Sequence, residues 1–317
     1  MHLTAGNTAE QHTAEEARPR IWAVGGGKGG VGKSFISASM GVALAKAGKR
    51  VVLVDLDLGG ANLHTSLGVP LSGNLTLSDY LNGKVRNINQ VAEQTEIDRI
   101  RLISGAADSL DVANIKYFQK TKLLRNLAKL DADYVILDLG AGTSYNTLDF
   151  FLEADHGLVS VTPDPSSVEN TYRFLKCVFI RSLRSVPKQV RETILQMMAK
   201  HRKAGARAGS LADFIEEMAR LKPKIADLLR RDLDTLKLHI IVNQVLEPSD
   251  TELGRAMQMA CSRYFSTRVG YLGFLHHDTL VLKSLQQHRT FLSTFPQSRL
   301  TVNIDAMVAS LMAQDDD

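Results

Sequence analysis

The sequence predicts an α/β protein whose sheet is doubly wound and mostly parallel. Short, continuously apolar runs recur along the chain, and helical patterns separate most of them. Strands that are apolar throughout are typical of a sheet covered on both faces, and parallel neighbours need helical crossovers. The length of 317 residues fits one large domain of this kind or two small ones.

Seven apolar runs are interpreted as buried strands, at residues 21–24, 50–57, 100–105, 133–140, 156–162, 238–245 and 268–275. Helices are expected at residues 34–46, which Gly48 follows, and at residues 115–130. Residues 1–19 are polar, with few large apolar side chains, and are expected to form a flexible N-terminal tail. The predicted α/β domain therefore spans residues 20–317.

One connection is too long for a single crossover. About 75 residues lie between the strand near Val159 and the strand near Ile240. Apolar residues keep a helical spacing from Leu211 to Leu229. We therefore expect a helical insertion at about 181–235, and we interpret its apolar stripe as packing against the main domain.

The composition excludes several classes of protein. The hydrophobic fraction is 44%, and no run approaches the roughly 20 apolar residues of a membrane span. The N-terminal segment lacks the apolar core of a secretory signal. Cys177 and Cys261 lie far apart and form no CxxC, so neither a zinc site nor an iron–sulfur cluster is predicted. We interpret both cysteines as reduced thiols of a cytoplasmic protein.

A phosphate-binding loop follows the first predicted strand. The string GKGGVGKS stands between that strand and a helix and fits the pattern GxxxxGK[ST]. In such a loop, backbone N–H groups and the helix N-terminus surround phosphate oxygens. Lys33 is expected to reach the β- and γ-phosphates of ATP, and the Ser34 hydroxyl to hold Mg²⁺. The predicted nucleotide-binding residues in the loop are Gly27, Lys28, Gly29, Gly30, Val31, Gly32, Lys33 and Ser34.

Lys28 is a second lysine inside this loop, and it gives the string GGGKGGVGKS a resemblance to the deviant Walker A loop of the MinD/ParA family. In that family the extra lysine reaches across a dimer interface to the partner's nucleotide. The resemblance implies that Lys28 supplies a catalytic positive charge in trans, as an arginine finger does. It also implies a homodimer that forms with ATP.

Two strand ends extend the resemblance. VVLVDLDLGGANLHTSLG is similar to the family's DxDxGxxNLD segment, and YVILDLGAG to its second switch. Both carry carboxylates to the edge of a parallel sheet where ligands bind. The resemblance implies that Asp57 activates the attacking water and helps to hold Mg²⁺, with Asp55 as a supporting group. Asp138 would hold Mg²⁺ through a water, and Gly140 and Gly142 would let the loop move.

The end of the strand at 238–245 is a candidate for base recognition. Relatives begin this loop with an Asn-Arg pair that reads adenine. Asn243 matches the asparagine, whereas Gln244 replaces the arginine. The segment 273–278, GFLHHD, lacks the proline of the family's base loop, so no site is predicted there.

The segments TPDPSSVENTYR and SLQQHRTFLSTFPQSR look like the FlhG/FleN branch, which regulates flagellar number and placement. This resemblance implies an ATP-driven switch that positions or assembles a cellular structure, with a protein partner that stimulates hydrolysis or is positioned. The predicted location is the cytoplasm, with peripheral binding at a membrane or cell pole. MinD and FlhG end in a basic amphipathic helix, whereas this chain ends in AMVASLMAQDDD, whose acids would be repelled by anionic lipid.

Other functions on this scaffold were weighed against the switch. Nitrogenase-type reductases and iron–sulfur carriers need cysteines that DLGAGTSYN and the rest of the chain do not provide. A ParA-like partition ATPase that binds DNA remains the alternative, and ATP-dependent, salt-sensitive DNA binding would favour it. A scaffold that binds ATP without hydrolysing it is a further alternative, and a measurement of phosphate release would separate it from the switch.

A basic segment, residues 173–207, is a candidate surface for DNA, anionic membrane or an acidic partner. It contains ten Lys and Arg residues, and Glu192 is its single acid. Arg181, Arg184, Lys188 and Arg191 would form one stripe on a continuous helix. A new helix beginning at Pro187 would still expose Lys188 and Arg191 together. The alternative is a solvated face balanced by acids elsewhere.

Overall fold

The computed structural model describes residues 18–57, 60–70, 75–105, 115–204 and 211–316, with side chains for all of these except residues 198–204 and 316. Its centre is an eight-stranded sheet of order β3-β4-β2-β5-β1-β6-β7-β8. All neighbours are parallel except β3 and β4. The strands are β1 (Arg20–Gly25), β2 (Val51–Leu56), β3 (Glu93–Gln94), β4 (Ile100–Ile103), β5 (Tyr134–Leu139), β6 (His156–Val161), β7 (Leu238–Val245) and β8 (Val269–His276).

The predicted fold class is therefore confirmed. Every predicted strand is present, and only the two-residue edge strand β3 was missed, because so short a segment has no detectable period. The helices are α1 (Lys33–Lys46), α2 (Leu63–Leu67), α3 (Leu77–Leu81), α4 (Tyr117–Leu127), α5 (Tyr145–Leu152), α6 (Pro165–Ser182), α7 (Lys188–Ala204), α8 (Leu211–Leu221), α9 (Pro223–Asp234), α10 (Glu252–Phe265), α11 (Leu280–Gln286), α12 (Phe291–Thr294) and α13 (Arg299–Asp316).

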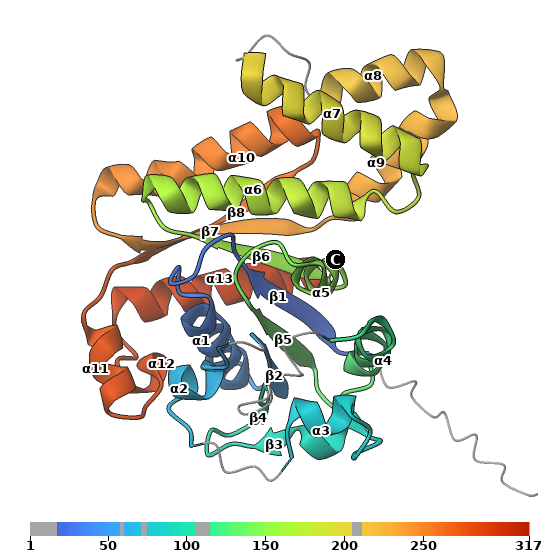
Figure 1. Cartoon of the computed structure of the whole chain (residues 1–317). Helices are drawn as coiled ribbons and strands as arrows, with labels where there is room; N and C mark the ends of the chain where they lie inside the picture. Colours follow the sequence, from blue (N-terminus) through green and yellow to red (C-terminus); the bar gives the residue numbers. More distant parts are fainter. Residues whose placement is uncertain (1–17, 58–59, 71–74, 106–114, 205–210, 317) are drawn as a thin grey trace, which may run out of the picture.

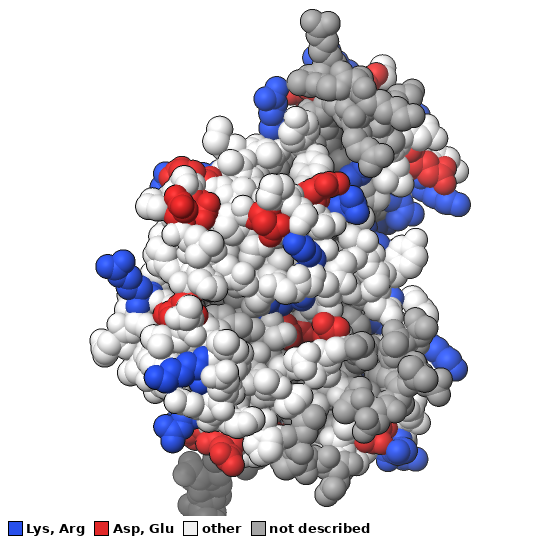
Figure 2. Space-filling model, turned by 60° about the vertical axis from the view of Figure 1, so that its left-hand side comes forward, with Lys and Arg blue, Asp and Glu red and all other residues white. Residues whose placement is uncertain are grey.

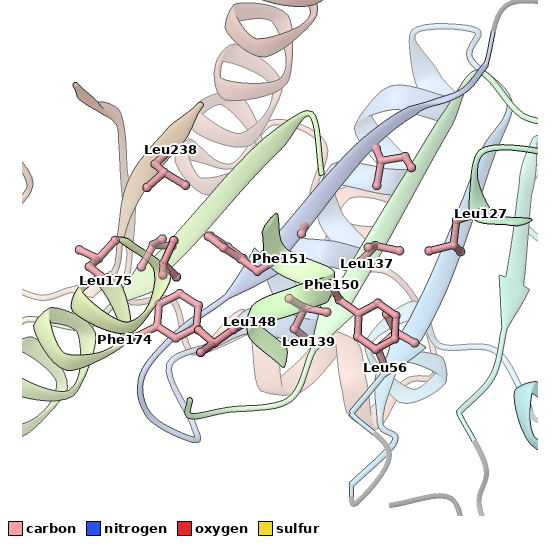
Figure 3. Close-up of a cluster of buried hydrophobic side chains, with 14 of the residues drawn as sticks. Leu56, Leu127, Leu137, Leu139, Leu148, Phe150, Phe151, Phe174, Leu175 and Leu238 are labelled. Atoms are coloured by element: carbon pink, nitrogen blue, oxygen red, sulfur yellow. The ribbon is translucent and has the colours of Figure 1, made fainter. Parts of the chain in front are cut away.

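Helices cover both faces of the sheet, as Figure 1 shows. One apolar cluster joins the sheet to α1, α2, α12 and α13. The other joins the opposite face to α4, α5, α6 and α10. Its centre contains Phe150 and Phe151 of α5 and Phe174 of α6 (Figure 3). Burial on both faces explains why β1, β2, β5 and β6 read as apolar runs without alternation.

Three described helices, α7, α8 and α9, lie between α6 and β7, in the segment where a helical insertion was expected. Phe214 and Ile215 of α8 and Leu229 of α9 are buried in the same cluster as α6 and α10. The apolar stripe thus packs against the main domain and is continuous with its core. Figure 1 shows these helices above α6, away from the carboxyl end of β1.

The predicted tail at residues 1–19 lies largely outside the described residues. At its end, Pro19 is buried and Arg18 forms an ion pair with Asp155, at 2.6 Å between Nη2 and Oδ1. These two residues before β1 therefore contact the domain, although they belong to the predicted tail. No helix in the described part of the chain combines the length and hydropathy of a membrane span.

The last turn of α13 is anchored by a buried polar cluster. Asp315 is buried; its Oδ2 accepts a hydrogen bond from Trp22 Nε1 at 3.1 Å, and its Oδ1 lies 3.2 Å from His156 Nε2. His156 Nδ1 in turn lies 2.9 Å from His239 Nε2. The terminal segment that was expected to present its acids to solvent instead ties α13 to β1 and β6, because one of those acids has buried partners.

We expect this cluster to make stability depend on pH. Burial lowers the pKa of His239 to about 4, and His156 contributes in the same direction. The unfolded chain, with an ordinary histidine pKa of about 6.5, then binds more protons between these values, so the free energy of unfolding falls as pH falls through the window. Gln in place of His239 can still donate a hydrogen bond to His156 but does not titrate. Between pH 7 and pH 5, the free energy of unfolding of His239→Gln should therefore fall by about 2 kcal/mol less than that of wild type. Urea unfolding at both pH values measures this, and equal losses in both proteins would contradict it.

Candidate functional site

The phosphate loop runs from the end of β1 to the start of α1. Gly32 is the N-cap residue of α1, with φ of 87°, and supplies no side chain to cap the first N–H groups. A Cβ on Gly32 would lie 2.1 Å from Asn243 Nδ2, and one on Gly27 would lie 2.0 Å from the Asn170 carbonyl oxygen. Both positions therefore require glycine. The uncapped N-terminus of a 14-residue helix is able to bind an anion, and it lies where the motif predicts the phosphates.

The loop is held from behind by β6 and β7. The carbonyl oxygen of Val31 accepts hydrogen bonds from Ser160 Oγ at 2.8 Å and from Asn243 Nδ2 at 2.9 Å. Gln244, with φ of 58°, donates from Nε2 to the Gly30 carbonyl oxygen at 3.2 Å. Asn243 is predicted to read the base; the structure places its amide nitrogen against the loop and its side chain in the lining of the cavity beside the loop. Ser160 was not predicted, because a serine inside an apolar strand carries no motif.

Two carboxylates lie side by side on neighbouring strands at the carboxyl edge of the sheet. Asp55 of β2 pairs in register with Asp138 of β5. Burial raises the pKa of Asp138 to about 6, although the Ser34 and Ser37 hydroxyls and the charge of Lys33 oppose the shift. Burial, followed by the charge of Asp138, raises the pKa of Asp55 to about 7. Neighbouring carboxylates of this kind favour a cation.

The surroundings of Asp138 fit Mg²⁺. Its Oδ1 accepts a hydrogen bond from Ser37 Oγ at 3.0 Å, whereas its buried Oδ2 has no hydrogen-bond partner in the described part of the chain. The described residues contain no group of three His, Cys, Asp or Glu side chains that could hold a metal by themselves. That suits Mg²⁺, which keeps waters and takes ligands from phosphates. Ser34, at the start of α1, lies close enough to Asp138 for its hydroxyl to affect the pKa of that carboxyl group.

Asp55 and Asp57 differ in what they contact. The carboxylate of Asp55 accepts hydrogen bonds from the backbone N–H of Asp57 and of Leu63, each at 3.1 Å. Asp57 is half-exposed, and its carboxylate lies over Gly140, where a Cβ would come within 3.1 Å of Oδ1. The end of β2 and the loop after β5 therefore meet at Asp57, and Asp55 positions it.

The two lysines of the loop point to different places. Lys33, the first residue of α1, is buried. Lys28 donates from Nζ to Asp164 Oδ1 at 3.1 Å and to Ser166 Oγ at 2.7 Å, at the N-terminus of α6. Asp164 caps α6 through the Ser167 N–H at 2.9 Å. Hydrogen bonds from Ser166, Thr162 and Ser167, together with Lys28, hold the pKa of Asp164 far below its usual range.

A cavity of about 420 Å³ opens beside the loop, between the predicted residues Gly32 and Asn243 and the segment after β8, where no site was predicted. Its lining includes Gly32, Asn243 and Gln244, and residues 276–279 after β8 complete one side. The signal that could have located it is topological, since β7 and β8 end at the same edge as β1. A larger open groove, about 920 Å³, lies between α10 and the start of β8 and contains none of the predicted site residues.

The basic segment does not form the stripe that a continuous helix would give. Helix α6 ends at Ser182, and α7 begins at Lys188. Arg181 donates to both carboxylate oxygens of Asp149, and Arg184 Nη1 donates to Glu153 Oε1 at 2.6 Å. The helix is therefore broken near Pro187, the other case considered, and acids outside the segment pair with Arg181 and Arg184, two of the four residues of the stripe. Lys188 and Arg191 do share α7, whereas the side chains of Lys200, Arg202, Lys203 and Arg207 lie outside the described ones.

The loop, the carboxylates and the sheet order together point to one family of nucleotide-binding proteins. The CobQ/CobB/MinD/ParA nucleotide-binding domain matches residues 22–291. The chain belongs to this family.

Relatives of the CobQ/CobB/MinD/ParA domain agree with the predicted resemblance. The antiactivator FleN of Pseudomonas aeruginosa is 23% identical over 91% of this chain and 84% of its own. The septum site-determining protein MinD of Bacillus subtilis is 34% identical over 47% of this chain and 55% of its own. The flagellum site-determining protein YlxH of Helicobacter pylori is 32% identical over 49% of this chain and 52% of its own. The chain thus spans about half the length of several relatives.

Solved structures show the same fold. MinD of Pyrococcus horikoshii, complexed with Mg-ADP, superposes with a TM-score of 0.62 at 20% identity, over 92% of this chain and 96% of that one. A ParA family ATPase from Chlorobium tepidum superposes with a TM-score of 0.63 at 18% identity, over 93% of this chain and 99% of that one.

The role of Asn243 can be separated by choice of ligand. If the Asn243 amide mainly supports the loop, Asn243→Ala should weaken the binding of ATP, GTP and inorganic tripolyphosphate equally, by about tenfold each. The reason is the loss of one buried hydrogen bond worth about 1–2 kcal/mol. Competition with a fluorescent ATP analogue measures all three. Thr294→Ala, on α12, serves as a control. A loss confined to ATP would instead assign Asn243 to the base.

Proposed function

We propose that this chain binds and hydrolyses ATP with Mg²⁺ and that ATP joins two copies into a homodimer, the switch that positions or assembles a cellular structure. The observation that carries the proposal is the convergence of Lys33, Asp57 and Asp138 at the carboxyl ends of β1, β2 and β5. They surround one uncapped helix N-terminus, which is the arrangement that phosphoryl transfer needs.

Each side chain has a distinct role in the proposal. The loop N–H groups and Lys33 bind the β- and γ-phosphates. Ser34 holds Mg²⁺ directly, and Asp138, with its unpartnered Oδ2, holds it through water. Bound Mg²⁺ neutralises phosphate charge at the γ-phosphate. Asp57, half-exposed beside Gly140, orients the attacking water.

Lys28 is the residue that links dimerisation to catalysis. In the single chain its ammonium group contacts Asp164 and Ser166, on the outer side of the loop. Gly29 and Gly30 beside it face open space, since no atom of the described residues lies within 4 Å of a Cβ placed there. A second copy approaching this open side would present its γ-phosphate to Lys28, and the stronger charge would draw the lysine away from Asp164.

The cavity beside the loop is the proposed adenine site. Its apolar members, Phe35, Val281 and Leu285, would cover the faces of a base, while Asn243, Gln244 and Asp278 offer polar groups at its edge. The segment 276–279 takes the place of the proline-containing loop that the sequence lacks.

The cellular role rests on relatives whose names describe an antiactivator and site-determining proteins for septum and flagellum. By analogy, this chain would act in the cytoplasm or at the periphery of a membrane or pole, with a protein partner. The DNA-binding alternative gains no support from the surface in Figure 2, where Lys and Arg side chains stand apart with Asp and Glu among them.

Lys33→Ala should abolish ATP binding, because the phosphates lose their main cationic contact. We expect an affinity at least about 100-fold weaker by calorimetry with Mg-ATP. Lys129→Ala, an exposed lysine beyond the end of α4, should bind as wild type does. ATP affinity within a few-fold of wild type in folded Lys33→Ala would rule out the phosphate assignment.

Dimerisation and hydrolysis should separate at Lys28 and Asp57. Asp57→Ala should dimerise with ATP and release phosphate about 100-fold more slowly, since the water is no longer oriented. Lys28→Ala should bind ATP and dimerise poorly. Asp164→Asn keeps the cap of α6 but weakens the hold on Lys28, so it should dimerise at lower ATP concentration than wild type. Light scattering during gel filtration reports the dimer. If Lys28→Ala dimerises as wild type does, Lys28 has no role in trans.

A further inference from the structure

Three large aromatic side chains stand exposed where α4, α5 and α6 meet, and none of them has a role in the proposed ATPase. Tyr117 and Phe118, in the first turn of α4, are 79% and 65% exposed, and Tyr145, the first residue of α5, is 73% exposed. Aromatic side chains gathered on a surface are typical of protein interaction sites, where they contribute most of the binding energy.

An ionic triad, in which Lys120 and Asp149 are buried and Arg181 is half-exposed, holds these elements together. Asp149 of α5 accepts hydrogen bonds from Lys120 of α4 and from Arg181 of α6, whose Nε lies 2.8 Å from Oδ1 and whose Nη2 lies 3.0 Å from Oδ2. Each cation also lies near one exposed ring. Lys120 Nζ is 5.7 Å from the centre of the Tyr117 ring, and the Arg181 guanidinium is 5.0 Å from that of Tyr145. Tyr117 and Tyr145 thus each have a cation beside them before any partner arrives, and such preorganisation lowers the entropy cost of binding.

The surroundings are positive. Asp149 faces two cations with one carboxylate, so the triad keeps a positive charge. Residues 116–129 carry Lys116, Lys120, Lys122, Arg125 and Lys129 and no Asp or Glu. Lys116 and Arg125 are both exposed. Lys116 precedes Tyr117 directly, and Arg125 follows Phe118 by seven residues, two turns further along the same face of α4. The complement of this surface is a segment with carboxylates around an apolar group.

We propose that the α4–α5 surface, formed by Lys116, Tyr117, Phe118, Lys120, Tyr145 and Arg181, docks an acidic segment of a partner protein that carries an apolar or aromatic anchor. The anchor packs between the rings of α4 and Tyr145. Its flanking carboxylates pair with Lys116, Arg125 and the free side of Arg181.

Two other occupants fit the surface less well. In a two-fold contact with a second copy, the cations of α4 would face the same cations of the partner, which is repulsive. An anionic membrane would need an apolar face along the helix. Leu123 and Leu127 of α4 are buried in the core, so only the first turn has apolar groups to offer.

The position of this surface links it to the nucleotide. Tyr145 follows the loop of Gly140 and Gly142, and the Gly142 N–H donates to the Gly26 carbonyl oxygen at the phosphate loop, at 3.1 Å. A movement of this loop displaces Tyr145 directly, because Ser144 caps α5 through the Thr147 N–H. Nucleotide-dependent docking rests on the proposed ATPase function, whereas docking itself does not.

The test is a selection of random 16-residue peptides displayed on phage against the whole chain, with Mg-ATP and without nucleotide. We expect selected peptides to be rich in Asp and Glu around Trp, Phe or Leu. One such peptide, labelled with fluorescein, is then titrated by anisotropy. Tyr117→Ser/Phe118→Ser should bind it at least about tenfold more weakly, the loss expected for two anchoring rings. Lys116→Glu/Arg125→Glu should also bind weakly and should lose the salt dependence of wild type. Met259→Ser, an equally exposed apolar side chain on α10, is the matched control and should bind within about twofold.

Other results would overturn the proposal. Selected peptides without enrichment in Asp and Glu would do so, as would α4 variants that bind the peptide as tightly as wild type. If the α4 variants prove to be unfolded by their thermal midpoint, full binding by the folded Tyr145→Ser variant would overturn it. Loss of the ATP dimer in the folded α4 variants would make the surface a contact between copies. Sedimentation of wild type, but not the variants, with phosphatidylserine vesicles would make it a lipid site. If ATP hydrolysis is absent and the peptide still binds through these residues, the switch function fails and the docking surface stands.

Discussion

The carbonyl oxygen of Val31 is the point on which the site depends. Ser160 and Asn243 donate to it from β6 and β7, so the phosphate loop that follows β1 is fixed by the next two strands of the sheet. Because the Asn243 amide occupies the space where a side chain of Gly32 would lie, the loop can reach its partners only with glycine there. The loop is thereby rigid on its inner side and open at Gly29 and Gly30, where a second copy would approach.

Charge at the site is balanced between two buried carboxylates and a buried lysine. The raised pKa values of Asp55 and Asp138 reflect how poorly the protein alone stabilises two negative charges on adjacent strands. Lys33 and the hydroxyls of Ser34 and Ser37 offset part of that cost for Asp138. The remaining demand for positive charge is what makes the site suitable for a divalent cation. Lys28 takes no part in this balance within one chain, since Asp164 holds it on α6.

The two sides of the catalytic edge thus have different neighbours. On one side the phosphate loop leads through Lys28 to the N-terminus of α6. On the other, the loop after β5 leads through Gly142 to Tyr145 and to the ionic triad around Asp149. The loop after β5 therefore connects the site to a surface built from α4, α5 and α6, which lies over the core packed on Phe151 and Phe174.

The sequence by itself determined the sheet, the phosphate loop and the acids at the strand ends. These features are local, because the strands are apolar runs and the loop residues are consecutive, so a pattern along the chain identifies them. Asp138 and Asp55 could be placed at one edge for the same reason, since every parallel strand ends there. What depends on distant contacts could not be read in this way. The pairing of Lys28 with Asp164, of Arg181 with Asp149 and of Asp315 with Trp22 joins residues 136, 32 and 293 positions apart. Only the packing of helices on the sheet decides which acid meets which base, and so whether a charged residue faces solvent or is buried in the structure.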